Sequence, residues 1–337
     1  MRSELADQRL QPVRNLATNP GFETAGAVTT VRTNGMPNPA VASTAGVYGT
    51  GVEVAVGAGF VQATVLTVHS STGLPRVNMT DHTLSVVVVP GDPYYIRAEV
   101  RHSRGTDMQL RTWFNTSDGT YVTNEQGSVL PTSSTSWTDL VMTGTVPATA
   151  TRMGYQIIGN ATADPSVVGA TFDFRRLTTD SGTYFDGSTP AAGDFTYAWA
   201  GTENASASVQ QALAVAGMTG GWQSGEWATS GTKSLHVPDD GTATLSLTTS
   251  STAIVTARNA GQQLTVGESS VTSPAADQPV RATGETLVTL GPGWWDKLLI
   301  VEGVYVGDYG DGNTPGWRWD GDSEASTSTG YPSLSRP

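Results

Sequence analysis

The sequence predicts an all-β protein with two tandem β-sandwich domains, each followed by a similar closing segment. Three observations lead to this prediction. The composition is typical of strands joined by many turns, since the 337 residues include 39 Gly and 18 Pro and only 14% are charged. No long segment has the apolar spacing of an amphipathic helix. The third observation is an internal duplication, in a chain long enough for two domains that each bury a core.

The duplicated stretch closes both predicted domains. Residues 184–208 read YFDGSTPAAGDFTYAWAGTENASAS, and residues 309–328 read YGDGNTPGWRWDGDSEASTS. Because Asp and Gly favour turns, and a Trp can cover the end of a sandwich, we interpret both copies as structural closing segments. The residues expected to build them are Asp186, Gly187, Trp199, Asp311, Gly312 and Trp319.

Strand signals fill the first domain, which we place at residues 14–180 after a polar N-terminal arm at 1–13. The stretch LSVVVVPGDPYYIRAEVRH at 84–102 reads as strand, turn and strand, and residues 136–158 contain a further pair of strands. In ATFDFRRLT at 170–178, aromatic and charged residues alternate, as expected of a closing strand with one buried face.

The second, smaller domain is predicted at residues 218–308. A closing segment and linker at 181–217 precede it, and the repeated closing segment at 309–337 follows it. The segments ATLSL, AIVTARN and TLVTLGPGWW supply strands. DKLLIVEG at 296–303 then takes the place that ATFDFRRL takes in the first domain.

The charge balance limits the partners. The net charge is −12, and the 18 basic residues are 16 Arg and two Lys without any basic run. Nucleic acids are held by clustered cations, so we expect no nucleic-acid partner. The acidic excess would also repel an anionic membrane surface but would leave neutral sugars unaffected.

The sequence contains no Cys, so disulfides and thiolate metal sites are excluded. The N-terminal residues MRSELADQRLQPV lack the apolar core of a signal peptide, and no apolar run approaches the ~20 residues of a membrane span. We therefore expect a protein made in the cytoplasm, without membrane insertion. A β-rich protein without a secretion signal fits a virion component that is released by lysis.

A resemblance becomes specific at RNLATNPGFE, residues 14–23. This stretch resembles the opening strand of jelly-roll carbohydrate-binding modules of the galactose-binding-like type, and the resemblance extends over roughly residues 14–180. Together with DKLLIVEG and the repeated closing pattern, it is similar to the minor tail proteins of siphophages that infect actinobacteria. Two departures are Gly310, where that pattern has an aromatic residue, and FDFRRL in the first copy.

The resemblance implies jelly-roll-like sandwiches in a structural protein of the virion, located in the phage tail at its tip and assembled in the host cytoplasm. It implies other tail proteins as partners, a homo-oligomer in the assembled tail and a role in host-cell attachment. The first domain is then a candidate for binding cell-envelope glycan.

Aromatic side chains are the candidates for contact with sugar, because the apolar face of a pyranose stacks on indole or phenol rings. Adjacent Tyr94 and Tyr95 must point to opposite faces of a regular strand, so one of them should be accessible. The alternative for each aromatic residue is a place in a sandwich core. The candidate carbohydrate-binding residues are Tyr95, Arg97, Trp113 and Tyr155 in the first domain, and Trp222 and Trp227 in the second.

A structural calcium ion is a further expectation from the jelly-roll resemblance. In such modules a calcium ion often ties the first strand to the last, and the matching acids are Glu23 and Asp173. Oxygen ligands suit calcium, but two carboxylates define a site only together with backbone carbonyls. The alternative is one surface acid and one turn-capping Asp.

We expect no enzyme. The sequence has no nucleophile elbow, phosphate loop or zinc-protease motif, and no catalytic residues are assigned. Two rival functions stay open: a pure tail scaffold without glycan binding, which predicts buried aromatics, and a cell-wall glycan depolymerase, which predicts two carboxylates facing each other across a cleft.

Overall fold

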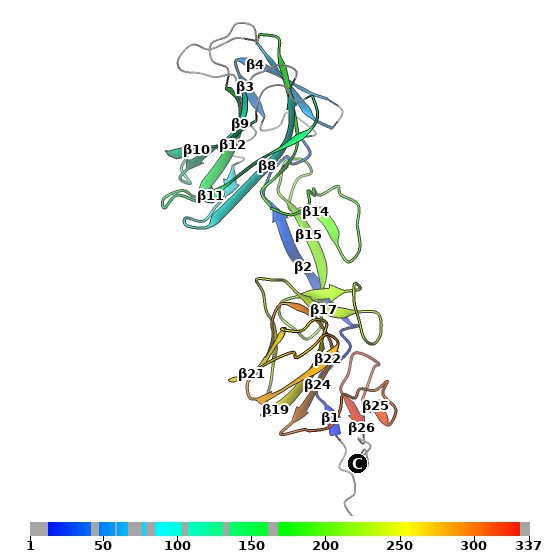
Figure 1. Cartoon of the computed structure of the whole chain (residues 1–337). Helices are drawn as coiled ribbons and strands as arrows, with labels where there is room; N and C mark the ends of the chain where they lie inside the picture. The colour runs from blue at the N-terminus through cyan, green and yellow to red at the C-terminus, as the bar shows by residue number, and fades with distance from the viewer. Residues whose placement is uncertain are drawn as a thin grey trace, which may run out of the picture. The chain divides into compact units, whose positions relative to one another are not determined.

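The computed structural model shows a chain of β-strands that forms two compact units (Figure 1). It describes residues 13–41, 47–57, 59–66, 76–78, 85–102, 107–130, 135–160 and 168–330. Thr30–Ala191 and Phe195–Gln211 form the inserted unit; Met1–Thr29, Ala192–Asp194 and Ala212–Pro337 form the flanking unit. Every regular element in these ranges is a strand, which confirms the all-β prediction. The same ranges hold no helix that is long and apolar enough to cross a membrane.

The inserted unit is a sandwich of two antiparallel sheets. The first sheet has the order β10-β9-β12-β6-β3, with β7 beside β12. Its strands are β3 Tyr48–Thr50, β6 Arg76–Asn78, β7 Val86–Val87, β9 Asp107–Asn115, β10 Tyr121–Leu130 and β12 Arg152–Asn160. The second sheet, of order β11-β8-β13-β5-β4, consists of β4 Val52–Val56, β5 Val61–Val65, β8 Pro93–His102, β11 Thr138–Thr145 and β13 Thr171–Thr178.

One hydrophobic core lies between these sheets. Alternation along β8 turns Tyr94, Ile96 and Ala98 inward, and Phe172 and Phe174 of β13 join them as the sequence predicts. The turn expected between residues 84 and 102 is present before β8. The strands predicted at 136–158 are also present as β11 and β12, but they lie in different sheets instead of pairing with each other.

The flanking unit is a second sandwich. Its larger sheet has the order β16-β17-β24-β19-β22, with β16 Trp222–Ser224, β17 Ser234–Val237, β19 Ser251–Ala257, β22 Gln278–Gly284 and β24 Gly293–Glu302. The opposing sheet has the order β18-β23-β20-β21, with β18 Ala243–Ser246, β20 Gln263–Val266, β21 Ser269–Thr272 and β23 Leu287–Leu290. Buried Trp295 is the largest side chain of its core.

Two small sheets complete the fold. One consists of β1 Val13–Asn15, β26 Ser328–Gly330 and β25 Trp317–Trp319, in that order. The other has the order β14-β15-β2, with β2 Ala25–Asn34, β14 Thr196–Trp199 and β15 Ser208–Val215. Most residues of the linker that the sequence predicts just before residue 218 therefore belong to strand β15. The chain passes between the units within β2 and again within β15.

The opening stretch at 14–23 belongs to the flanking unit, which corrects the predicted boundary of the first domain at residue 14. Buried Asn15 carries the connection: its amide donates to the carbonyls of Leu298 at 3.2 Å and Gly310 at 3.4 Å. Its Oδ1 accepts from the backbone N–H of Ala17 at 3.0 Å and Ile300 at 2.9 Å. The arm predicted at 1–13 lies, apart from Val13 of β1, outside the described residues.

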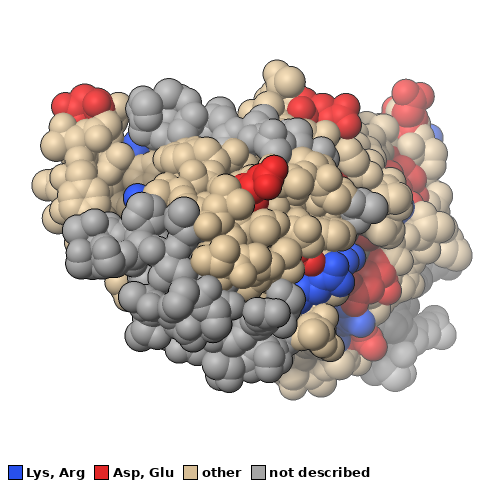
Figure 2. Space-filling view, turned by 90° about the horizontal axis from the view of Figure 1, so that it is seen from above, with Lys and Arg blue, Asp and Glu red and all other residues tan. Residues whose placement is uncertain are grey.

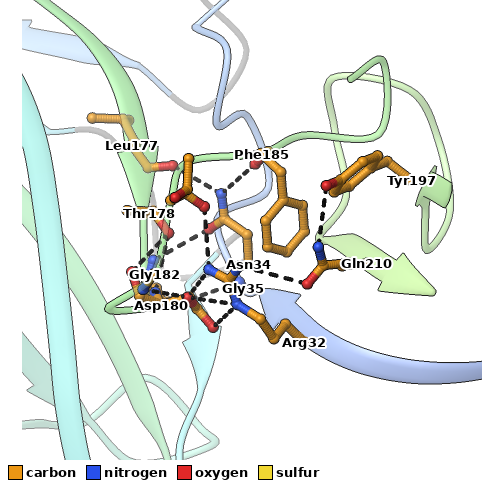
Figure 3. A network of polar contacts seen from close by, with 12 residues as sticks. Arg32, Asn34, Gly35, Leu177, Thr178, Asp180, Gly182, Phe185, Tyr197 and Gln210 are labelled. Atoms are coloured by element: carbon orange, nitrogen blue, oxygen red, sulfur yellow. Dashed lines mark hydrogen bonds and ion pairs between the residues drawn. The ribbon is translucent and has the colours of Figure 1, made fainter. Parts of the chain in front are cut away.

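The inserted unit has an opening segment of its own, built around Asn34 (Figure 3). The Asn34 amide donates to the carbonyls of Leu177 at 3.0 Å and Phe185 at 3.1 Å. Its Oδ1 accepts from the N–H of Met36 and of Thr179, both at 3.2 Å. These partners match those of Asn15 one for one. The duplication thus includes the opening segments, and one copy is inserted into the other along the sequence.

The closing segments fold alike in both units. Asp186 accepts from the N–H of Ser188 at 2.8 Å, and the Trp199 indole covers Gly187. In the second copy, Asp311 accepts from the N–H of Asn313 at 2.9 Å, and the Trp319 indole covers Gly312 in the same way. Each Asp closes the turn that follows it, and each Gly leaves room for the ring.

Gly310 departs from the aromatic residue at this position because another ring fills its place. A Cβ at Gly310 would lie 2.1 Å from the indole of Trp317. In the inserted unit the corresponding Phe185 is itself buried and packs on Tyr197, with ring centroids 5.5 Å apart.

Candidate functional site

A groove with a volume of about 350 Å³ lies on the face of the first sheet that is turned away from the core of the inserted unit. Strand β9 contributes Arg111, Trp113 and Asn115, which share one face because they alternate with the core residues Leu110 and Phe114. We call it the aromatic groove, and its lining residues are Tyr48, Arg76, Arg111, Trp113, Asn115, Tyr121 and Gln156.

Strand pairing brings these residues together from five strands. On β12, Gln156 lies opposite Arg111 of β9 and opposite Asn78 of β6. At the other end, Tyr121 of β10 lies opposite Asn115. The groove therefore depends on the register of the whole sheet and not on one loop.

The indole of Trp113 lies on Gly154, the residue opposite it on β12. A Cβ at Gly154 would stand 2.0 Å from an indole carbon, so only glycine leaves space for the ring. One face of the indole is thus held against the backbone, and the half-buried side chain presents the other to the groove. Tyr48 and Tyr121 add rings that are 48% and 57% exposed.

Three buried polar atoms in the aromatic groove have no hydrogen-bond partner among the described residues. They are the acceptors Asn115 Oδ1 and Gln156 Oε1 and the donor Arg76 Nε. The amide nitrogen of Gln156 is fixed by a hydrogen bond of 2.6 Å to Asn78. A buried polar group without a partner costs about 1–3 kcal/mol. A ligand hydroxyl group that reaches these atoms, after a shift of the side chains that cover them, would relieve this cost.

The structure places Tyr155 outside the groove, which corrects its assignment as a sugar-binding residue. Its neighbours Gly154 and Gln156 face the groove, so alternation turns Tyr155 into the core, where its side chain is 2% exposed. Burial raises the pKa of its hydroxyl.

Tyr95 and Arg97 lie on β8, in the sheet opposite the aromatic groove, so they cannot form one site with Trp113. Of the adjacent tyrosines, Tyr94 points into the core and Tyr95 points outward, as alternation predicts. Arg97 forms an ion pair of 3.0 Å with Asp139.

The two candidate tryptophans of the flanking unit do not gather into a comparable site. Trp222 is 8% exposed and packs edge-on against His236, with ring centroids 4.5 Å apart. Burial lowers the pKa of His236. Trp227 is half-buried. Trp222 is therefore a packing residue. Trp227 stays a candidate sugar-binding residue, only because its side chain is partly exposed.

The two predicted calcium ligands belong to different units, which corrects their assignment to one sandwich. Glu23 accepts from the N–H of Thr232 at 2.6 Å and of Lys233 at 2.8 Å within the flanking unit. Asp173 accepts from Arg101 at 2.7 Å within the inserted unit. The described residues contain no group of three His, Cys, Asp or Glu side chains that could hold a metal ion.

A second kind of groove occurs once in each unit, between the sheet and the closing segment. In the inserted unit it measures about 690 Å³ and is lined by Arg97, Glu99, Arg176 and residues 181–184. In the flanking unit a groove of about 550 Å³ includes Lys297 and Tyr309 at the corresponding places. In the groove of the inserted unit, Glu99 forms ion pairs with Arg175 at 2.8 Å and Arg176 at 3.0 Å, so its carboxylate already has counter-charges from the protein.

Of the residues in the aromatic groove, only Trp113 is predicted from the sequence as a sugar-binding residue. Its alternation with Arg111 and Asn115 along one strand is a local signal that points to one polar face. Arg76 and Tyr48 come from short strands far away in the sequence, and no local pattern marks them.

No protein-family model and no curated protein matches this chain. Solved structures similar to it are carbohydrate-binding modules. A CBM4 module is 14% identical, with a TM-score of 0.30, and covers 43% of this chain and 95% of its own. The xylan-binding CBM22-1 domain of a Paenibacillus barcinonensis protein is 12% identical, with a TM-score of 0.31, and covers 46% and 96%.

The tandem CBM22-1 and CBM22-2 domains of the same Paenibacillus barcinonensis protein are 10% identical to this chain. They cover 83% of this chain and 100% of their own, with a TM-score of 0.31. At these identities and TM-scores, nothing about the ligand of this chain follows from the similarity.

Proposed function

We propose that the inserted unit binds glycan of a bacterial cell envelope in the aromatic groove, as part of a structural tail protein that contributes to host attachment. The observation that carries the proposal is the half-buried Trp113, held flat on Gly154 beside buried polar atoms that lack partners. A flat ring with hydrogen-bonding groups at its edge is the arrangement that a pyranose requires.

In this proposal, the apolar face of one sugar ring stacks on Trp113. Asn115 and Gln156 accept hydrogen bonds from its hydroxyl groups, and Arg76 donates one. Tyr48 and Tyr121 contact neighbouring sugar units along the groove. The function is binding and not catalysis.

One open groove of this kind gives low affinity, because few contacts must offset the ordering of a flexible glycan. Several copies on one particle, acting on a repetitive surface, raise the overall affinity without any new contact. A homo-oligomer among other tail proteins would provide such copies, and the sequence resemblance to minor tail proteins is what supports this part of the proposal.

A pull-down on cell envelopes of actinobacterial hosts tests the proposal. We expect saturable binding by the full chain and its loss in Trp113→Ala. Trp137→Ala is the matched control, since it removes a half-buried indole that packs on Arg175 and does not line the groove. Circular dichroism and thermal melting establish that each variant is folded. A folded, multimerised protein that binds no envelope, or Trp113→Ala binding as well as the parent, would contradict the proposal.

A further inference from the structure

We infer that the glycan recognised by the aromatic groove is acidic, with a carboxylate or phosphate group held by Arg76 and Arg111; this inference rests on the proposed function. The first observation is the charge of the lining. Two of its seven residues are Arg and none is Asp or Glu. This cationic lining belongs to a chain with a net charge of −12.

The two arginines of the groove differ from most other arginines of the inserted unit. Arg32 pairs with Asp180, Arg101 pairs with Asp173, and Arg97, Arg175 and Arg176 surround Glu99. In Figure 2 the largest basic patch likewise adjoins acidic side chains. Within the described ranges, neither Arg76 nor Arg111 has an ion pair. Among the described residues of this acidic chain, five arginines of the inserted unit thus have acidic partners, whereas Arg76 and Arg111 do not.

The guanidinium group of Arg111 is held in place by neighbouring side chains, and that of Arg76 has an unused donor. Arg111 Nε donates to Asn124 Oδ1 at 3.0 Å, and Asn124 in turn donates to the hydroxyl of Tyr121, so the plane of the guanidinium is fixed. Arg76 Nε is buried without a partner among the described residues. A guanidinium stays charged at any accessible pH, and its planar fork matches the oxygens of carboxylate or phosphate.

A third cation lies on the same sheet face. On β12, Arg152 shares the face of Gly154 and Gln156, directly opposite Asn115 of β9. The only hydrogen bond of its side chain within the described part of the chain goes to the carbonyl of Ser85 at 3.4 Å. A neutral glycan would leave all three guanidinium groups without a counter-charge, whereas an acidic glycan would supply one.

The test compares glycans that differ only in charge. Calorimetry of the full chain measures binding to polygalacturonate and to the same polymer after its carboxylates have been reduced to neutral alcohols. A glycerol phosphate polymer forms a third arm and distinguishes phosphate from carboxylate. We expect one anionic polymer to bind about tenfold or more tightly than the reduced polymer, the amount that one charge-assisted hydrogen bond contributes.

Arg111→Gln should abolish this preference and leave the weak affinity for the reduced polymer. Arg318→Gln, which removes an exposed arginine of the flanking unit, is the matched control and should change nothing. Equal binding to charged and reduced polymers overturns the acidic ligand and leaves glycan binding intact. Binding to none of the three polymers, with envelope binding that still depends on Trp113, also overturns it. Loss of envelope binding altogether is a failure of the proposed function itself.

Discussion

Trp113 and Gly154 act as one unit, since the ring can lie flat only where the facing residue has no side chain. The backbone of Gly154 has an ordinary strand conformation, so its role is to leave space and not to provide backbone freedom. This distinguishes it from the turn glycines with positive φ, such as Gly91 before β8.

Gly154→Ala should therefore abolish glycan binding at a moderate cost in stability. The added methyl group occupies the place of the indole, so the ring must leave the sheet, and overpacking costs about 1–3 kcal/mol. Envelope binding measures the loss of glycan affinity, and thermal unfolding followed by tryptophan fluorescence measures the loss of stability. Gly127→Ala is the control in the same sheet, because its Cβ meets Met142 at 3.3 Å and leaves Trp113 in place. Full binding by folded Gly154→Ala would show that the flat indole is not required.

Asn34 and Asn15 are the second pair of residues with one physical role. Each is fully buried, and each forms hydrogen bonds with four backbone groups. We expect Asn34→Ala to lower the free energy of unfolding of the inserted unit by about 3 kcal/mol, because several buried groups lose partners at once.

Asn15→Ala should lower the free energy of unfolding of the flanking unit by a similar amount and leave that of the inserted unit unchanged. Differential scanning calorimetry of both variants measures which unit is affected. If both variants lower the same transition equally, the assignment of the two opening segments to separate units is wrong.

At the scale of elements, the bulge in the last long strand of each sandwich is repeated. Arg176 and Lys297 both have left-handed backbone conformations, with φ of 50° and 58°. In the inserted unit the bulge turns Arg175 and Arg176 toward the same acid, Glu99. Burial alone raises the pKa of Glu99, but the hydrogen bonds from both arginines lower it, and the net pKa lies below the ordinary value of 4.5.

The stability that Glu99 contributes should therefore depend on pH. A carboxyl group with a lowered pKa contributes stability above its unfolded pKa, and this is lost as the pH falls through the folded pKa. Glu99→Gln should cost about 1–2 kcal/mol at pH 7. The difference in free energy of unfolding between the variant and the parent should become smaller below pH 4.5. Thermal melts from pH 7 to about 3 measure it, with Glu53→Gln as an exposed control; a constant gap would contradict the ion-pair role.

The elements show what local sequence information can and cannot supply. Alternation predicts the last long strand of the inserted sandwich, because Phe172 and Phe174 mark a buried face without any knowledge of the partner strand. It also required that Tyr94 and Tyr95 point to opposite faces. Alternation alone does not predict which sheet a strand joins. Tyr155 and Trp113 are therefore equal candidates for sugar binding in the sequence, although the strand register turns Tyr155 into the core and Trp113 into the groove.

At the scale of the whole molecule, one sandwich is inserted into the sequence of another. The duplication was evident at the closing segments because they retain Asp, Gly and Trp. The duplication is hard to see at the opening segments, because only Asn15 and Asn19-Pro20 return there, as Asn34 and Asn38-Pro39. Sequence order then suggested that the first opening belonged to the first sandwich. The pairing of β1 with β26 and the hydrogen bonds of Asn15 show that it belongs to the last sandwich.

This organisation predicts that the flanking unit folds without the inserted one. The ends left by the insertion are close, since the N–H of Ala216 donates to the carbonyl of Thr24 at 3.1 Å. Replacing residues 30–211 with a short Gly-Ser linker should therefore close a small loop at little entropic cost. The deletion also removes Asp194, which accepts from Ser224 at 3.0 Å and Lys233 at 3.2 Å, so some stability is lost.

The measurement is a cooperative thermal transition with the near-ultraviolet circular dichroism of a packed Trp295. Residues 30–211 alone should also fold and should retain the glycan binding of the full chain, because every residue of the aromatic groove lies within them. Asn15→Ala in the shortened chain should destabilise it as in the full chain, whereas Asn34 is no longer present. A shortened chain that stays unfolded, with the isolated insert folded, would mean that the flanking sandwich requires the inserted one to form.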